Sequence, residues 1–209
     1  MNTDKKEEAM TMELLQFVEQ RSDMTQRDLA ARLGVALGLA NAYLKRCILK
    51  GLVKASQAPA NRYLYYLTPK GMAEKSKLTA EYLKRSFEFY RQTSRAYAVL
   101  MKDCEAQNHR QVVLCGVSEL AEIASLRAQE YGIEILGVFE PETDTNKFFG
   151  LPVWNKYADI TGADALILTA LNNPELLYKK LQSVNKTLPV LVPEFLDFVY
   201  QQAKISSSN

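Results

Sequence analysis

A long helical segment near the middle of the chain does most to constrain its fold. Thr68 and Pro69 make a favourable start, because threonine caps a helix N-terminus and proline suits the first helical position. Beyond them, Gly71 is the only glycine or proline in about 35 residues. Since glycine and proline are the strongest breakers of helices, we expect one long helix here. The chain therefore divides into a part before this helix and a part after it.

The two halves of the chain differ in charge. Residues 1–104 carry 18 Lys and Arg against 11 Asp and Glu, a net +7, whereas residues 105–209 carry 8 against 13, a net −5. Between residues 21 and 62 there are 8 basic side chains and only 2 acidic ones. A basic segment of this kind indicates a polyanionic partner for the first half, and a solvated basic face is the alternative.

The first 50 residues predict three helices. Apolar residues at helical spacing indicate a helix over residues 7–20, and Thr25 with Asp28 has the spacing of a capping box that opens a second helix. The second helix is expected to stop at Gly34, and residues 37–50 to form a third after a short turn. Two short helices around a glycine-containing turn are typical of a helix-turn-helix.

Strand-like segments follow the third predicted helix. Residues 52–54, a polar loop at residues 56–61 and an aromatic strand at residues 62–67 predict a β-hairpin wing. The expected domains are a winged helix-turn-helix DNA-binding domain over residues 1–68, a long linking and dimerisation helix over residues 69–107, and a Rossmann-like ligand-sensing domain over residues 108–209.

The long helix carries a seam of residues spaced alternately by three and four, as in a heptad repeat. The seam consists of Ala73, Ser76, Ala80, Leu83, Phe87, Tyr90, Ser94, Tyr97, Met101 and Cys104. We expect this face to join two copies of the chain into a homodimer. The alternative is that it packs against its own domain, since small and polar seam residues weaken a coiled coil.

Strand-like and helix-like segments alternate in the second half. The apolar runs are at residues 112–115, 133–139, 165–169 and 188–192, and the helical patterns are at residues 119–131 and 174–183. Their alternation predicts a Rossmann-like parallel sheet with flanking helices, so that the whole chain combines α/β and α+β architecture. The tail from Pro193 is expected to form an amphipathic helix.

The exposed face of the second helix of a helix-turn-helix enters the major groove. Asn41 is the main candidate for reading bases, because a side-chain amide can bind adenine through two hydrogen bonds. The N-terminus of the preceding helix suits a backbone phosphate through its free amides. The candidate contacts with double-stranded DNA are Thr25, Gln26, Arg27, Gly38, Leu39, Asn41, Ala42, Lys45 and Arg46, with Arg62 and Tyr63 from the wing.

These segments resemble MarR-type winged-helix regulators over roughly residues 8–104, and most closely those associated with exopolysaccharide gene clusters. The run Tyr-Leu-Thr-Pro-Lys-Gly at residues 66–71 is part of this resemblance. Residues 37–45 resemble the recognition helix of that subgroup, except that Leu39 stands where the subgroup often has a basic residue. The resemblance implies a cytoplasmic bacterial transcriptional regulator of polysaccharide-related genes.

A glycine-containing turn in the second half has part of a dinucleotide-binding motif. Gly116 and Ala121 occupy the first and last positions of Gly-x-Gly-x-x-Gly/Ala, with Ser118 at the second glycine. Glu140 follows the next strand, where an acid can hold ribose hydroxyls. The candidate ligand-binding residues are Gly116, Val117, Ser118, Glu119, Ala121, Glu140, Thr169, Ala170 and Asn172. The alternative is a degenerate Rossmann fold that binds nothing.

The second half also resembles two kinds of known domain over residues 111–197. The segments that carry this resemblance are residues 137–141, 149–154 and 164–169. One relative is the NAD(H)-binding sensor domain of Rex-type redox repressors. The other is the small Rossmann-like domain of polysaccharide-biosynthesis enzymes and sugar acyltransferases. The resemblance implies a nucleotide-type ligand, which is a nucleotide, a nucleotide sugar or NAD(H).

Catalysis has little support in the sequence. The single histidine, His109, lies in a polar linker, and Cys47, Cys104 and Cys115 lack the spacing of a zinc site or a disulfide framework. No signal-peptide core or membrane-length apolar run is present in these 209 residues. We therefore expect a cytoplasmic protein that is not an enzyme. The alternatives to a ligand-responsive regulator are a DNA-bound scaffold and, with less support, a small nucleotide-sugar enzyme fused to a winged helix.

Overall fold

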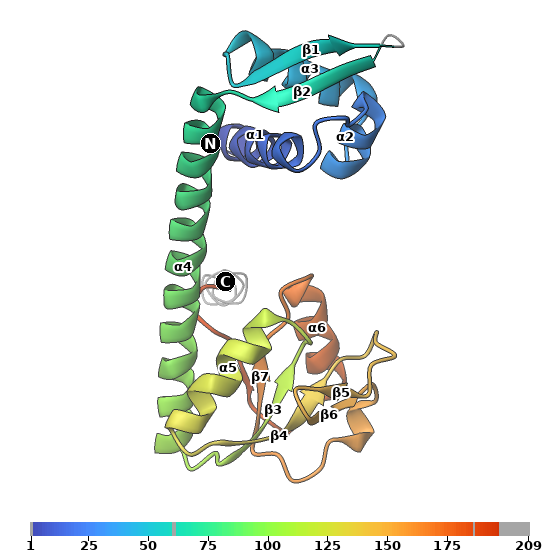
Figure 1. The fold of residues 1–209 in the computed structure, drawn as a ribbon. Helices are drawn as coiled ribbons and strands as arrows, with labels where there is room; N and C mark the ends of the chain where they lie inside the picture. Colours follow the sequence, from blue (N-terminus) through green and yellow to red (C-terminus); the bar gives the residue numbers. More distant parts are fainter. Residues whose placement is uncertain (1, 60–61, 186, 197–209) are drawn as a thin grey trace, which may run out of the picture. The chain divides into compact units, whose positions relative to one another are not determined.

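The chain divides into two compact units, residues 1–87 and 88–209. The structure, a computed structural model, describes residues 2–59, 62–185 and 187–196 (Figure 1). The division falls inside α4 (Pro69–Ala106), which is the long helix predicted from the sequence. Among the described residues, no helix is both long enough and apolar enough to cross a membrane.

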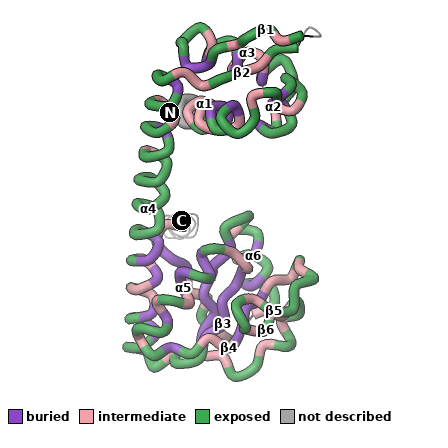
Figure 2. The backbone as a smooth tube through the Cα atoms, viewed as in Figure 1, coloured by how far each residue is buried: buried purple, intermediate pink, exposed green. Residues whose placement is uncertain are grey.

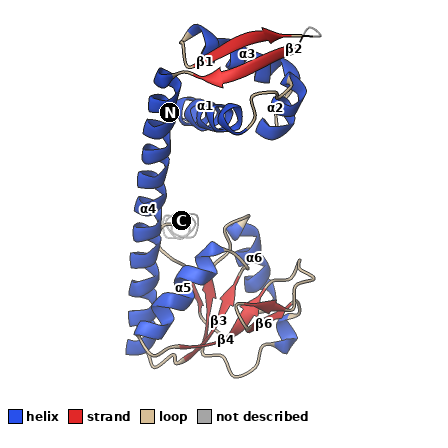
Figure 3. Ribbon diagram, viewed as in Figure 1, coloured by secondary structure: helices blue, strands red, loops and turns tan. Residues whose placement is uncertain are grey.

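The first unit is a winged helix-turn-helix (Figure 3). Its elements are α1 (Asn2–Gln20), α2 (Gln26–Leu33), α3 (Leu37–Leu49), β1 (Val53–Ala58) and β2 (Arg62–Leu67). The strands form an antiparallel pair with Val53 opposite Leu67. Helix α1 starts at Asn2 rather than at residue 7, and β1 continues through Ala58, where a loop was expected.

Apolar side chains from all three helices and the wing form the core of the first unit. The fully buried members are Leu14 and Leu15 of α1, Leu29 of α2 and Ala40 of α3. Leu44 and Cys47 lie one and two turns beyond Ala40, so the same stripe of α3 faces the core. The opposite stripe of α3 is exposed, so it can contact another molecule.

The second unit is an α/β fold built on one six-stranded sheet. The strand order is β5-β6-β4-β3-β7-β8, with every neighbouring pair parallel except β5 with β6. Its elements are β3 (Gln111–Cys115), α5 (Glu119–Glu130), β4 (Glu134–Phe139), β5 (Lys147–Phe148), β6 (Leu151–Trp154), the 3-10 helix η1 (Tyr157–Asp159), β7 (Ala165–Leu168), α6 (Pro174–Val184) and β8 (Val190–Leu191). The parallel sheet predicted from the sequence is confirmed, and the antiparallel edge strand β5 is an addition to it.

Successive residues of β3 face the two sides of this sheet. Val112 and Leu114 join a core cluster with α5 and the end of α4, whereas Val113 and Cys115 join a second cluster with α6. Helices therefore flank both faces, as expected from alternating strand and helix patterns. The predicted tail helix lies outside the described residues beyond Leu196.

The C-terminal part of the predicted α4 seam is buried within the second unit. Tyr97, Met101 and Cys104 are 0% exposed in the cluster with α5. The Tyr97 hydroxyl donates a hydrogen bond to the Leu168 carbonyl at 2.9 Å, and burial raises the pKa of Tyr97. The dimer prediction is thus wrong for these residues, because the chain's own sheet covers them. The large seam residues that stay exposed are Leu83, Phe87 and Tyr90. Figure 2 shows the middle of α4 as mostly exposed and its C-terminal part as partly buried.

The three cysteines are buried free thiols, one in α3, one in α4 and one in β3. Burial raises the pKa of Cys47 to about 11 and that of Cys104 to about 11. It also raises the pKa of Cys115, with a contribution from the nearby Glu140 carboxylate. At neutral pH all three are therefore protonated and poorly reactive, since the thiolate is the nucleophile.

Candidate nucleic-acid interface

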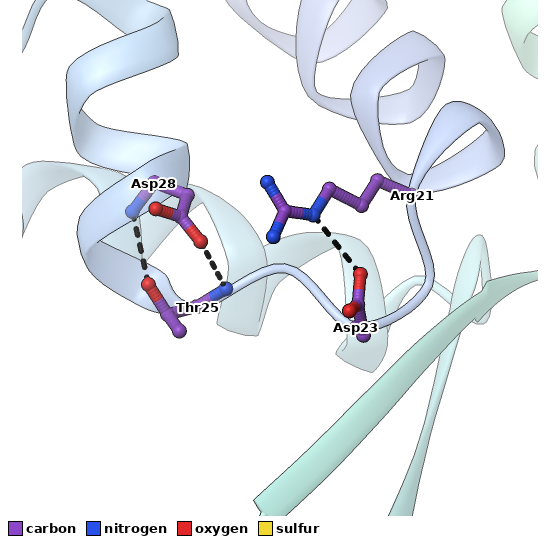
Figure 4. Close-up of polar contacts among 4 residues, drawn as sticks. All are labelled: Arg21, Asp23, Thr25 and Asp28. Carbon is purple, nitrogen blue, oxygen red and sulfur yellow. Dashed lines mark hydrogen bonds and ion pairs between the residues drawn. The ribbon is translucent and has the colours of Figure 1, made fainter.

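The start of α2 is fixed by the capping box predicted from the sequence (Figure 4). The Asp28 amide donates to the Thr25 hydroxyl oxygen at 3.1 Å, and the Thr25 amide donates to the Asp28 carboxylate at 2.9 Å. These bonds lower the pKa of Asp28. The Thr25 hydroxyl still has its own proton to donate. The amides of Gln26 and Arg27 precede the first intrahelical bond, so they too can donate to a phosphate.

A groove of about 480 Å³ lies between the start of α2, the start of α3 and the wing. Its lining includes Thr25, Gln26 and Arg27 from α2 and its cap, Leu37 from α3, and Arg62 and Tyr63 from β2. Five of these six were predicted as DNA contacts, and the structure brings them together around one depression. The turn before α2 is held by the Arg21–Asp23 ion pair at 3.0 Å (Figure 4).

Glutamates of α1 neutralise several of the basic side chains of the first unit. Glu13 pairs with Arg32 at 3.4 Å, and Glu8 pairs with Arg85 at 2.9 Å. By contrast, Arg27, Lys45 and Arg62 are exposed and form no ion pair with any residue that the structure describes. Positive side chains without a described ion-pair partner therefore lie on α2, α3 and the wing.

Helix α3 begins without a side-chain cap. Ala36 is its N-cap residue and has no side chain that can accept the first amides. Gly38 is exposed and has nothing within 4 Å of the position of a Cβ atom. The first turn of α3 can therefore approach a phosphate closely, with its free amides and positive helix dipole directed at the anion.

The exposed stripe of α3 is largely apolar. Leu39 is 48% exposed and Leu49 is 87% exposed, and Ala42 and Lys45 lie on the same side of the helix. Side chains of this kind contact the thymine methyl group in a major groove rather than the polar base edges. Lys45 and Arg46 add positive charges on this side of the helix.

Asn41 lies at the edge of the exposed stripe rather than at its centre. Its side chain is half-buried, and its Oδ1 atom is buried without a hydrogen-bond partner among the described residues. A bidentate contact with adenine needs both the oxygen and the nitrogen of the amide. Asn41 can make that contact only if its side chain turns outward, which costs the protein no existing hydrogen bond.

Arg46 differs from the other predicted contacts because its side chain is already paired within the chain. Its guanidinium forms an ion pair with Glu7 of α1 and lies over the Tyr43 ring, 5.3 Å from the ring centroid. The ion pair raises the pKa of Arg46. To bind phosphate or guanine, Arg46 would have to leave this pair.

The predicted ligand-binding residues of the second unit also lie together, at the carboxyl ends of β3, β4 and β7. Glu140 accepts a hydrogen bond from the Val117 amide at 3.1 Å. Ser118 donates its hydroxyl proton to the Thr169 carbonyl at 2.5 Å and accepts from the Leu120 amide at 3.0 Å. Glu119 and Asn172 are exposed beside them, and Ala121 is buried in the first turn of α5.

Gly116 lies directly against the loop that follows β7. A Cβ atom at Gly116 would be 2.5 Å from both the Cα and the N of Ala170, and the Thr169 hydroxyl donates to the Gly116 carbonyl at 2.7 Å. A dinucleotide needs the loop amides free and room for a pyrophosphate beside the first glycine. The Val117 and Leu120 amides and the space beside Gly116 are already used within the chain, which weighs against a pyrophosphate in this turn.

Comparison with known proteins gives one family match. Residues 9–54 match a family model described as winged helix-turn-helix DNA-binding. The matched range contains α2 and α3, most of α1 and the start of β1. A search of curated proteins finds no match. The match supports a DNA-binding regulator, in agreement with the groove and the charges of the first unit.

Leu37 and Tyr65 line the groove, and the sequence analysis did not include them among the candidates. Leu37 has a signal in the sequence, since it opens the third predicted helix next to Gly38. Tyr65 has no such signal in the sequence. Its side chain is buried whereas that of the neighbouring Tyr66 is exposed, and the pairing of the two wing strands decides which of them faces inward.

Proposed function

We propose that this chain is a sequence-specific transcriptional regulator that binds double-stranded DNA as a homodimer. The observation that carries the proposal is the groove beside α2, α3 and the wing. Two helix N-termini with unused amides meet there with the unpaired Arg27 and Arg62. The first helix and the wing hold these elements in the arrangement that places α3 in a major groove and the wing against the backbone.

The test compares two single variants on two duplexes. One duplex is selected by the protein from a random library, and the other is a scrambled sequence of equal length. Asn41→Ala is expected to reduce discrimination between them by roughly 1–3 kcal/mol, because it removes a base contact. Arg27→Ala is expected to weaken binding to both duplexes equally, because it removes a phosphate contact. Fluorescence anisotropy measures both affinities.

Gln16→Ala serves as the control for this test. Gln16 is exposed on α1 and lies outside the groove, so its loss is expected to leave both affinities unchanged. If Asn41→Ala weakens both duplexes equally, Asn41 does not read bases. We would then expect the apolar side chains of the stripe that contains Leu39 to make the sequence-specific base contacts.

Exposed apolar side chains on α4 support the homodimer. Leu83 is 46% exposed, Phe87 is 58% exposed and Tyr90 is 40% exposed. Burying such side chains at an interface contributes roughly 1.5–3 kcal/mol each. We therefore expect the double variant Leu83→Glu, Phe87→Glu to sediment as a monomer at concentrations where the unmodified protein is a dimer.

Val99→Glu is the matched control for the dimer. Val99 is 59% exposed on the same helix. At 100° per residue its side chain points roughly 120–160° away from those of Leu83 and Phe87. If the double variant is still a dimer and Val99→Glu is a monomer, the interface lies on the opposite face of α4.

Two finer parts of the proposal rest on resemblance. The control of polysaccharide-related genes rests on the likeness of residues 37–45 to the recognition helix of one MarR-type subgroup, and mapping of bound sites in the host genome tests it. A nucleotide-type ligand rests on the likeness of residues 111–197 to Rex-type and polysaccharide-biosynthesis domains. The bonds of Val117 and Ser118 in the crevice weigh against it, and a DNA-bound scaffold without a ligand is the alternative.

A further inference from the structure

One face of the second unit's sheet lacks a helix where the topology provides room for one. Strands β4 and β6 are parallel neighbours, and connections between such strands usually carry a crossover helix. In this chain the connection at residues 140–150 contains only the short strand β5. The connections β3 to β4 and β4 to β6 run in the same direction across the sheet, so right-handed crossovers place the missing helix on the side of α5.

A cavity of about 400 Å³ is lined by residues of α5, the start of β4 and the β5–β6 turn. Its apolar walls are Leu126, Ala128, Ile133, Ile135, Phe149 and Leu151. The volume lies within the range of small-molecule sites, which are mostly apolar with a few polar groups. The site is separate from the crevice at the carboxyl ends of the strands.

Phe149 forms a wall of this cavity in an unusual backbone conformation. Its φ is 50° and its side chain is 74% exposed, although bulky residues rarely adopt positive φ. The Phe148 ring meets it edge-on, with the ring centroids 4.8 Å apart. Residues in such conformations often mark functional sites, and here the strained turn holds an aromatic ring at the cavity.

The polar groups of the cavity include one carboxylate. Glu122 is exposed in the first turn of α5 and forms no ion pair with any residue in the described ranges. Ser125 donates its proton to the Ala121 carbonyl at 2.8 Å, which leaves its oxygen to accept. The Gln129 amide can accept a hydrogen bond through its oxygen and donate one through its nitrogen. These groups suit a cationic ligand and disfavour a phosphate.

We propose that this cavity binds a small amphipathic cation, with its apolar body against Phe149 and Leu126 and its amine at Glu122. A second copy of the chain is a poorer occupant. Only Leu126 and Phe149 are large, apolar and exposed there, whereas a stable interface needs about 800 Å² from each partner. This inference goes beyond DNA binding, because ligand binding is measured without DNA.

Calorimetric titration of the full chain with 2-naphthylmethylamine tests the proposal. The expected result is saturable binding of one molecule per chain, at least tenfold tighter than binding of 2-naphthylacetate. Phe149→Gly and Leu126→Ala are each expected to weaken the amine at least fivefold. Glycine adopts the conformation of residue 149 without strain, so the fold is retained. Glu122→Gln is expected to remove most of the preference for amine over acid.

Each variant has a control outside the cavity. Leu176→Ala removes another exposed leucine side chain, from α6, and Glu119→Gln removes the other carboxylate in the first turn of α5. Both are expected to bind the amine as the unmodified chain does. No saturable binding, or binding that Phe149→Gly and Leu126→Ala leave unchanged, overturns the proposal. So does a change of oligomeric state in these two variants without a change in amine affinity, since a protein partner would then cover the cavity.

Discussion

Gly116→Ala is expected to destabilise the second unit by about 3–5 kcal/mol, which is a large part of the stability of a typical domain. The added Cβ would meet the Ala170 backbone at 2.5 Å, and neither chain segment can move away without breaking the bonds of Thr169. Overpacking against backbone costs roughly 1–3 kcal/mol, and the φ of 115° at Gly116 adds strain. Urea unfolding measures the change through Trp154, the single tryptophan of the chain, which lies in β6.

Gly162→Ala is the matched control for this substitution. Gly162 also has a positive φ, 75°, but the nearest atom to an added Cβ is a glutamine side-chain oxygen at 3.8 Å. It is expected to cost only about 1 kcal/mol, from backbone conformation alone. If the two variants unfold at the same urea concentration, the loops after β3 and β7 do not touch. The crevice would then be open to a nucleotide.

DNA affinity is expected to fall by at least about 1000-fold between 50 and 200 mM salt. Each phosphate neutralised by a Lys or Arg contributes a slope of about −0.9 in log affinity against log salt, and about six such contacts give this loss. Arg27, Lys45 and Arg62 from each of the two copies in the proposed homodimer supply them. Titration of a fluorescent duplex at several salt concentrations measures the slope.

Removal of one charge from the groove has a defined effect on that slope. Arg62→Gln is expected to make it shallower by about 2, because one phosphate contact is lost in each copy of the proposed homodimer. Lys147→Gln removes an exposed charge from β5 in the second unit and is expected to leave the slope unchanged. Affinity that does not vary with salt would show that the basic side chains of the first unit do not face the DNA backbone.

The sequence was sufficient to predict the elements that local signals define. The capping box of Thr25 and Asp28, the end of α2 at Gly34 and the uninterrupted α4 follow from short-range hydrogen bonding and backbone preference. The parallel sheet followed from alternating apolar runs. The β5–β6 turn was missed because Phe149 occupies a position that usually requires Asn, Asp or Gly, and Gly150 was the only signal.

The candidate sites were predictable as groups of residues but not as surfaces. Spacing placed Thr25, Arg27 and Arg62 in one interface, yet the pairing of Arg46 with Glu7 depends on a contact 39 residues apart in sequence. The same holds for Glu140, whose carboxylate meets the Val117 amide. The apolar cavity could not be predicted, because it results from a helix that the chain lacks.

The three buried thiols can be used to measure local unfolding in each unit. Cys47 belongs to the first unit, whereas Cys104 and Cys115 belong to the second. A thiol reagent can modify each one only when its surroundings open, so labelling rates measured in native buffer follow local unfolding. Mass spectrometry of the labelled peptides then shows whether DNA slows labelling of Cys47 alone or protects all three thiols.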